Sequence, residues 1–313
     1  MALVSVIIPN YNHARFLRQR IDSVLRQTFQ DLEVILMDDC SSDESRLIIS
    51  EYAKEGRVRI EYNEKNSGST FKQWKKGIAL AHGEYIWMAE SDDYSDERFL
   101  ERLVPILDEE PDVTFVYCRS WLIAADGHTK RFADAYLTEI DPRRWTEDFR
   151  ADGREACREH FVHANSVPNA SSVVFRKNIY ERVGGVDESL MACGDWKLWV
   201  LLAFEGKIAY VGEPLNYYRE HPATVRGKIE ETGRGAGEHL SMVNWMLERV
   251  KATESIREKA YSVASYFWIP AVLSRRLSLR ERWKLFRTAV GSDPHALRRL
   301  IRPSSKAPAN AST

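Results

Sequence analysis

The chain has 313 residues with 44% hydrophobic and 11% aromatic side chains, enough to bury one large core, with or without an extension. Its formal net charge of −1 argues against a general nucleic-acid-binding protein. The four scattered cysteines form no C-x-x-C pair, which is typical of the reducing cytosol, and no run of about 18 apolar residues predicts a membrane span.

The first 117 residues alternate between strand and helix patterns. Five short apolar or alternating segments predict strands, at residues 4–9, 33–37, 58–62, 85–89 and 113–117. No charged region precedes the first segment, so it indicates a strand and not a signal peptide. Apolar residues recurring at helical spacing predict four helices, near residues 17–28, 47–52, 74–81 and 99–107. Ser41 and Glu44 have the spacing of a capping box before the second helix.

This alternation predicts an α/β fold, with a doubly wound, mostly parallel sheet flanked by helices and a helical C-terminal extension. Ligands of such sheets bind beyond the carboxyl ends of the strands. Asp38 and Asp39 follow the second strand, and Glu90, Asp92 and Asp93 follow the fourth. We therefore expect these carboxylates at the edge where a ligand binds.

The pattern weakens between about residues 119 and 168, where we expect loops and short helices. Later elements are predicted as strands at 171–175 and 208–211, a helix at 195–204, and a mainly helical region at 236–301. Residues 303–313 have the composition of a disordered tail.

Two common phosphate-binding motifs are absent, because neither G-x-G-x-x-G nor G-x-x-x-x-G-K-[ST] occurs after a predicted strand. The phosphates of a bound nucleotide would therefore need another source of positive charge. Closely spaced carboxylates repel one another, and a cation such as Mg²⁺ or Mn²⁺ relieves that repulsion while it bridges phosphate oxygens. Glu90, Asp92 and Asp93 are the candidate ligands of such an ion.

Each candidate residue also has a purely structural interpretation. Asp92 and Asp93 could cap the following helix, although Ser95 and Asp96 lie closer to it. The other structural interpretations are a turn at Asp38–Asp39, a helix N-cap at Asp195, and a polar surface residue at His221.

Four blocks in the same order resemble family 2 glycosyltransferases, which have the GT-A fold. The blocks are VSVIIPNYNHARFLRQRIDSVLRQTFQDLEVILMDDCSSDES, NSGSTFKQWKKGIALAHGEYIWMAESDDY, NASSVVFRKNIYERVGGVDESLMACGDWKLWVLLA and NYYREHPATV. The resemblance covers about residues 3–226 and implies a catalytic domain at 1–226. Within it, about 1–117 would bind the nucleotide and 118–226 the acceptor, and a helical appendage would follow at 227–302.

The resemblance implies a role for each matching position. Pro9 and Tyr11 match residues that border the nucleotide base, and Asp39 matches the carboxylate that accepts the pyrimidine N3–H. Asp92 and Asp93 match the acidic pair that binds the ribose hydroxyl and the metal, with Asp93 as the favoured direct ligand.

The acceptor side carries further matches. Asp195 matches the general base, and Arg219 and His221 match a segment that approaches the diphosphate or the metal. The sequence departs from the family pattern where Glu90 replaces an aspartate and Gly194 replaces the glutamate of a Glu-Asp pair. The usual Ala-Arg-Asn is also replaced, and Lys72 is the candidate for its basic contact.

The implied reaction is an inverting, metal-dependent transfer of a sugar. The donor would be a UDP- or dTDP-linked sugar and the acceptor a glycan or lipid-linked glycan, in the synthesis of cell-envelope polysaccharide. Asp195 would take the proton of the acceptor hydroxyl. Two alternatives remain at this stage: a nucleotidyltransferase on a similar sheet, and a non-catalytic module that binds sugar nucleotides or glycans.

The C-terminal region is strongly basic. Residues 274–302 hold nine Lys/Arg and two Asp/Glu, a net of 9 − 2 = +7. A basic amphipathic helix can lie on an anionic membrane, which predicts a cytoplasmic protein with possible peripheral contact at the inner membrane face. The alternative is a solvated helix that docks its apolar side on the catalytic domain.

Overall fold

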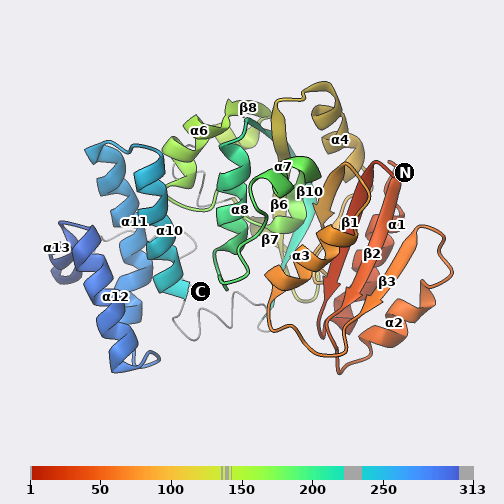
Figure 1. Ribbon diagram of the computed structural model, residues 1–313, viewed down its shortest axis with the longest axis horizontal. Helices are drawn as coiled ribbons and strands as arrows, with labels where there is room; N and C mark the ends of the chain where they lie inside the picture. The colour runs from red at the N-terminus through yellow and green to blue at the C-terminus, as the bar shows by residue number, and fades with distance from the viewer. Residues whose placement is uncertain (1, 135–136, 138–140, 142, 222–234, 303–313) are drawn as a thin grey trace.

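The computed structural model describes residues 2–134, 137, 141, 143–221 and 235–302, and its described strands form one ten-stranded sheet (Figure 1). The strand order is β3-β2-β1-β4-β9-β6-β10-β5, with β7 paired to β6 and β8 paired to β10. The bounds are β1 Val4–Asn10, β2 Leu32–Asp38, β3 Val58–Tyr62, β4 Tyr85–Met88, β5 Tyr94–Ser95, β6 Val113–Ala124, β7 Thr129–Phe132, β8 Phe149–Asp152, β9 Val173–Arg176 and β10 Lys207–Glu220.

The chain forms the expected α/β sheet, but the sheet predicted to be mostly parallel has mixed strand directions. The strands β1, β2, β3 and β4 pair in parallel, as do β6 and β10. The strand β9 runs antiparallel to both β4 and β6, so it joins these two parallel groups without reversing their common direction. The remaining strands β5, β7 and β8 also pair antiparallel.

Helices cover both faces of the sheet because alternate strand residues point to opposite sides. One core packs residues such as Val6 and Ile8 of β1 against Leu17 and Ile21 of α1, and continues to α4. The other packs Ile7 against α3 and α8. The described helices within residues 1–226, the predicted catalytic region, are α1 Ala14–Leu25, α2 Ser45–Glu51, α3 Thr70–Leu80, α4 Phe99–Glu109, α6 Gly153–Ala156, α7 Lys177–Arg182 and α8 Gly194–Ala203.

The capping box expected at Ser41 and Glu44 is wrong. The helix α2 begins at Ser45, and its N-cap Glu44 makes no side-chain capping bond. The Ser41 hydroxyl instead accepts the backbone N–H of Asn12 at 2.9 Å and the side-chain amide of Asn10 at 3.1 Å. The serine therefore ties the loop after β2 to the loop after β1.

The weakly patterned middle of the chain contains more strand than expected. The strand β6 continues to Ala124, and β7 and β8 add short strands to it and to β10. Both short strands carry charged, largely exposed side chains, so they lack the apolar runs by which buried strands are recognised. Short turns of 3₁₀ or π helix also occur at Arg144–Thr146, Cys157–Phe161 and Ala170–Ser172.

The C-terminal region is helical, as expected. Its helices are α10 Gly235–Arg249, α11 Glu254–Leu273, α12 Leu279–Ser292 and α13 Ala296–Ile301. They lie at the end of the molecule opposite β3 and α2 (Figure 1). Trp196 of α8, Trp268 of α11 and Leu285 of α12 belong to one continuous core, so the appendage is packed onto the catalytic region. The expected disordered tail at 303–313 lies outside the described residues.

Within the described residues, no helix has both the length and the apolarity needed to cross a bilayer.

Candidate active site

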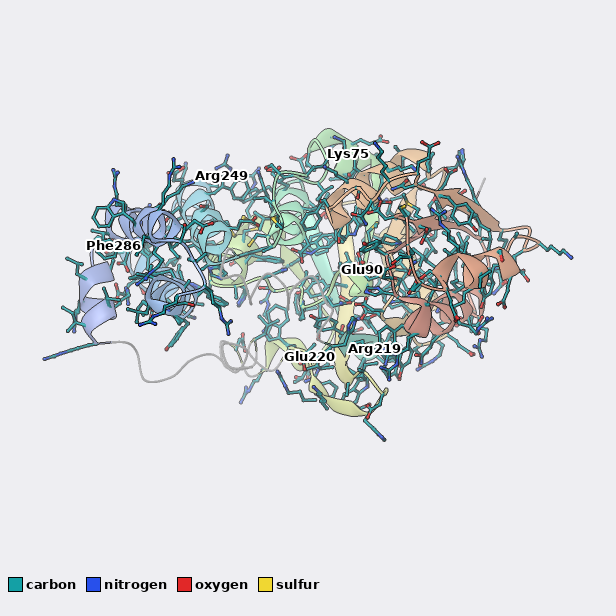
Figure 2. The ribbon with its side chains drawn as sticks, turned by 90° about the horizontal axis from the view of Figure 1, so that it is seen from below. Lys75, Glu90, Arg219, Glu220, Arg249 and Phe286 are labelled. Atoms are coloured by element: carbon teal, nitrogen blue, oxygen red, sulfur yellow. The ribbon has the colours of Figure 1, made fainter. Side chains whose placement is uncertain are left out.

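The candidate site lies at the carboxyl ends of β1, β2 and β4, where the end of β10 meets them. Glu90 and Arg219 are labelled in Figure 2. The backbone N–H of Arg219 donates to Asp93 Oδ1 at 2.8 Å, and its Nε donates to the backbone carbonyl of Asp92 at 2.8 Å. These bonds hold the end of β10 against the acidic loop that follows β4.

Two histidines from distant parts of the chain meet Asp92. Ligand atoms of His13, Asp92 and His221 all lie within 4.8 Å of one another, and His221 Nε2 is 3.0 Å from Asp92 Oδ2. Burial opposes ionisation of Asp92, but the hydrogen bond from His221 and the attraction of both histidines outweigh it and lower the pKa of Asp92. Two imidazoles and one ionised carboxylate form a donor set that can hold a divalent cation.

Asp93 faces the protein interior. It is 1% exposed, and its carboxylate accepts Asn169 Nδ2 at 3.0 Å, Ser171 Oγ at 2.7 Å and the backbone N–H of Arg219. Burial, with repulsion from Asp92, raises the pKa of Asp93 to about 6. Direct metal ligation by Asp93 stays a prediction, and it would require these hydrogen bonds to rearrange.

Glu90 is half-buried and accepts the indole N–H of Trp74 at 2.6 Å. Burial raises the pKa of Glu90 to about 8, and repulsion from Asp92 adds to this effect. The longer side chain at this position therefore reaches a tryptophan on α3.

Sequence reasoning missed Arg20, which supplies a positive charge beneath the acidic loop. Its side chain is fully buried, its Nε donates to the carbonyl of Glu90 at 2.8 Å, and its guanidinium lies 3.9 Å from Asp93 Oδ2. Burial lowers the pKa of Arg20 to about 10, which still leaves it charged at neutral pH. The available signal was an arginine on the core-facing side of α1, beside Leu17 and Ile21.

Asp39 is 5% exposed and is surrounded by donors of its own chain. Ser67 donates its backbone N–H and its hydroxyl, at 2.8 and 2.7 Å, and Asn63 and Gln73 donate side-chain amides. This network fixes the loop between β3 and α3. The expected contact of Asp39 with a pyrimidine N3–H stays a prediction.

The other expected nucleotide contacts differ in exposure. Pro9 is buried in β1, and Tyr11 beside it is 43% exposed. Lys72 is exposed on α3, and its ammonium lies 3.3 Å from the Ser67 carbonyl. Tyr11 and Lys72 are therefore accessible to a ligand.

The guanidinium of Arg219 is committed to the protein. Each of its nitrogens donates to an acceptor of the chain, at the carbonyls of Asp92, Ala124 and Ala125 and at Gln19 Oε1. The side chain is 2% exposed, and burial lowers its pKa. Arg219 thus fixes the loop after β4 by a hydrogen bond to the Asp92 carbonyl.

Asp195 lies in the first turn of α8, half-buried, and accepts Asn165 Nδ2 at 3.1 Å. The N-cap of α8 is Cys193, so Asp195 is not the N-cap of this helix. Asn169 and Ser171, shortly after Asn165, bind Asp93. One segment, residues 165–171, therefore links the proposed base to the acidic loop.

Gly194 replaces the family's usual glutamate for a steric reason. A Cβ atom at this position would lie 2.5 Å from a ring carbon of Phe71, which fills the space in front of the helix. The ring of Phe71 on α3 therefore occupies the space that a side chain at position 194 would need.

Sequence reasoning also missed Glu238 of α10. Its carboxylate accepts the backbone N–H groups of Met191, Ala192 and Cys193, at 2.9, 2.7 and 3.2 Å. These residues form the turn just before Asp195, and α8 has no side-chain cap of its own. A negative charge at a helix N-terminus is favourable, so Glu238 of the appendage caps the start of α8.

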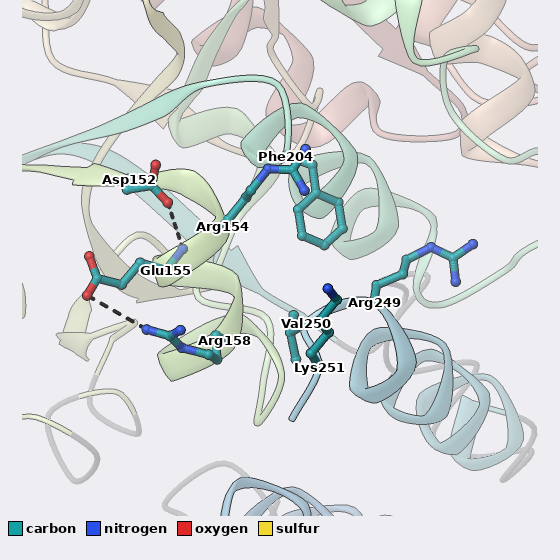
Figure 3. Close-up of a pocket in the computed structure, with 8 residues that line it drawn as sticks. All are labelled: Asp152, Arg154, Glu155, Arg158, Phe204, Arg249, Val250 and Lys251. Atoms are coloured by element: carbon teal, nitrogen blue, oxygen red, sulfur yellow. Dashed lines mark hydrogen bonds and ion pairs between the residues drawn. The ribbon is translucent and has the colours of Figure 1, made fainter. Parts of the chain in front are cut away.

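A separate pocket of about 370 Å³ lies between α6, the end of α8 and the end of α10 (Figure 3). Its lining residues are Asp152, Arg154, Glu155, Arg158, Phe204, Arg249, Val250 and Lys251. Asp152 pairs with Lys207 at the start of β10, whereas Arg219 lies near the end of that strand. The pocket is therefore not part of the candidate site.

Comparisons with known proteins agree with this arrangement. A family model described as Glycosyl transferase family 2 matches residues 5–162. An uncharacterized glycosyltransferase of Nostoc sp. is 30% identical over 234 residues, which are 70% of this chain and 65% of the relative. The chain thus spans slightly less than two thirds of that relative's length.

Two solved structures have a similar fold. TarS of S. aureus in complex with UDP-GlcNAc has a TM-score of 0.68 at 17% identity, covering 95% of this chain and 83% of that chain. The mannosyltransferase PcManGT of Pyrobaculum calidifontis, in complex with GDP-Man and Mn²⁺, has a TM-score of 0.59 at 16% identity, covering 96% and 78%. These likenesses confirm the expected GT-A-type fold, and the match to the family model over residues 5–162 shows that the chain belongs to glycosyl transferase family 2.

Proposed function

We propose that this glycosyltransferase moves a sugar, with inversion, from a UDP- or dTDP-linked donor to a glycan or lipid-linked glycan in cell-envelope polysaccharide synthesis. The observation that carries the proposal is the meeting of His13, Asp92 and His221. The neighbouring Asp93 binds Asn169 and Ser171, which lie in the same segment as the Asn165 that binds Asp195. The UDP-GlcNAc bound by TarS supports a UDP-linked donor, and the GDP-Man bound by PcManGT supports a nucleoside-diphosphate sugar in general.

His13, Asp92 and His221 would hold the divalent cation. Mg²⁺ prefers oxygen ligands, so the two imidazole nitrogens argue against Mg²⁺. The Mn²⁺ bound by PcManGT supports Mn²⁺ as the cation. A bound cation would neutralise the charge of the nucleoside diphosphate leaving group.

The residues of the chain would divide the remaining work. Tyr11 and Pro9 would border the base, Asp39 would receive its N3–H, and Lys72 would contact the phosphates. Asp195 would accept the proton of the acceptor hydroxyl as that oxygen attacks the anomeric carbon, in a single displacement. Asn165, which donates to Asp195 Oδ2, would orient the carboxylate.

We expect the enzyme in the cytoplasm, with peripheral contact to the inner membrane face through residues 274–302. A lipid-linked acceptor would be held at that face.

A calorimetric titration with UDP, with and without Mn²⁺, tests the proposal. We expect Mn²⁺ to increase the affinity of the wild type for UDP, and His221→Ala and Asp92→Asn to remove most of that increase, a loss of about 10- to 100-fold. His128→Ala is the matched control, because His128 is an exposed histidine in the turn between β6 and β7. An Mn²⁺ effect that survives in both site variants would contradict the metal assignment.

A further inference from the structure

The C-terminal helices concentrate the exposed apolar side chains of the molecule. Ten large hydrophobic side chains are exposed among the described residues, and six of them lie between Leu273 and Ile301. The six are Leu273, Leu279, Trp283, Val290, Leu297 and Ile301, with exposures from 38% to 79%. Such a concentration of exposed apolar side chains in one region indicates an interaction site.

Three of these residues and the partly exposed Phe286 form a continuous stripe on α12. Leu279, Trp283, Phe286 and Val290 recur every three or four residues, so they share one face of the helix. Phe286, labelled in Figure 2, lies at the far end of the molecule from the catalytic region, and its ring stacks on Trp283 at a centroid distance of 5.7 Å.

A different face of α12 makes the contact with the protein. Leu285 and Ala289 are buried in the core shared with α10 and α11. The helix is therefore already docked, and the four-residue stripe is not the surface by which it docks. The sequence left open whether this helix docks on the protein or lies on a membrane. The two interpretations are compatible, because one face of α12 contacts the protein and another face is left for a second surface.

A row of cations borders the stripe. Arg280, Lys284 and Arg287 have the same helical spacing and lie beside it, and all three are exposed. None of the three has a carboxylate within 4.0 Å among the residues that the structure describes, in contrast to Arg299, which pairs with Asp293 and Glu258. Their charges are thus available to an anionic surface.

We propose that the stripe and the cations beside it form a docking surface for a bilayer that contains anionic lipid. The interfacial region of a bilayer accepts the apolar side chains of the stripe, including Trp283. Its anionic headgroups attract the segment 274–302, which has a net charge of +7. A second copy of the chain fits less well, because two equally basic surfaces would face each other. The proposal rests on the proposed function: it specifies which side chains make the membrane contact stated there, and the contact would bring the enzyme to a lipid-linked acceptor.

Vesicle flotation tests the proposal on the full chain. We expect the wild type to float with vesicles of phosphatidylcholine and phosphatidylglycerol, to stay behind with phosphatidylcholine alone, and to bind less at high salt. Arg287→Gln should lower the partition coefficient about fivefold, and Trp283→Ser about tenfold.

Matched controls lie at the other end of the molecule. Leu47→Ser removes an equally exposed apolar side chain from α2, and Lys54→Gln removes an exposed charge. Neither should alter flotation. The proposal is overturned if the wild type does not float, if the controls lose as much as Trp283→Ser, or if ultracentrifugation without vesicles shows a dimer that Trp283→Ser separates.

UDP titration of the same variants distinguishes this proposal from the proposed function. Normal UDP binding with no flotation would reject the membrane surface alone. Flotation without UDP binding by the wild type would reject the nucleotide site alone.

Discussion

Asp195 combines partial burial with an orienting hydrogen bond from Asn165, in the first turn of α8. Gly194 next to it leaves no second carboxylate, since Phe71 occupies the space that a side chain would need. At the scale of single residues, all of the proposed base chemistry therefore depends on one carboxylate.

Replacing Asp195 by Asn keeps the size of the side chain and removes its basicity. We expect kcat to fall by about 10²- to 10⁴-fold while the dissociation constant for UDP stays unchanged, because the base acts only on the acceptor proton. Turnover assays and calorimetry on the same preparation measure both. Asp187→Asn is the matched control, since Asp187 lies in the preceding loop and pairs with Lys197. Near-normal turnover in Asp195→Asn would remove this residue from the base role.

Elements of the site differ in how far the sequence could specify them. Apolar runs ending in acidic residues located β2 and β4 correctly, because burial and strand ends leave a local pattern. His13 and Arg20 leave no such pattern, since they reach the acidic loop only through the packing of α1 against the sheet. The Ser41–Glu44 spacing fits a capping box, yet its serine bonds the loop after β1.

The helix α10 is an element of the appendage that acts on the catalytic region. Glu238 accepts three successive backbone N–H groups before α8, so Glu238→Gln should weaken these bonds and leave the turn less fixed. We expect kcat to fall by about tenfold through misplacement of Asp195, with the UDP dissociation constant unchanged. Glu238→Asp keeps the negative charge, so its kcat should fall less than that of Glu238→Gln. The pH dependence of kcat should shift in Glu238→Gln alone.

Glu248→Gln serves as the control, because Glu248 is exposed on the same helix. Should Glu238→Gln lower only the melting temperature and leave kcat intact, the residue would be structural and not positioning.

Across the whole molecule, histidines are packed in the appendage and in the catalytic region. His239 of α10 is partly buried, stacks on Phe267 and lies against Trp196. His160 is buried against Trp145, and His163, three residues later in the chain, is also buried. Burial lowers the pKa of His239 to about 4, of His160 to about 4 and of His163 to about 3. Repulsion from Lys259 adds to the effect at the last two.

These lowered pKa values predict a loss of stability in mild acid. Each histidine stays neutral in the folded chain but takes up a proton near its ordinary pKa of about 6.5 once the chain unfolds. The unfolded state then binds more protons below that pH, so stability is full above about pH 6.5 and falls toward pH 4, by up to about 1.4 kcal/mol per pH unit for each histidine. The raised pKa values of Glu90 and Asp93 act in the opposite direction, so a variant must be compared with the wild type.

Urea unfolding of His163→Leu and wild type between about pH 7 and pH 5 makes that comparison. The variant should lose stability less steeply with falling pH, by up to about 1.4 kcal/mol per unit, because its buried side chain has no proton to gain on unfolding. His128→Leu should keep the wild-type slope, since His128 is exposed in both states. Equal slopes for His163→Leu and wild type would show that His163 titrates alike in the folded and unfolded chain, and that its burial does not govern the acid limit of the fold.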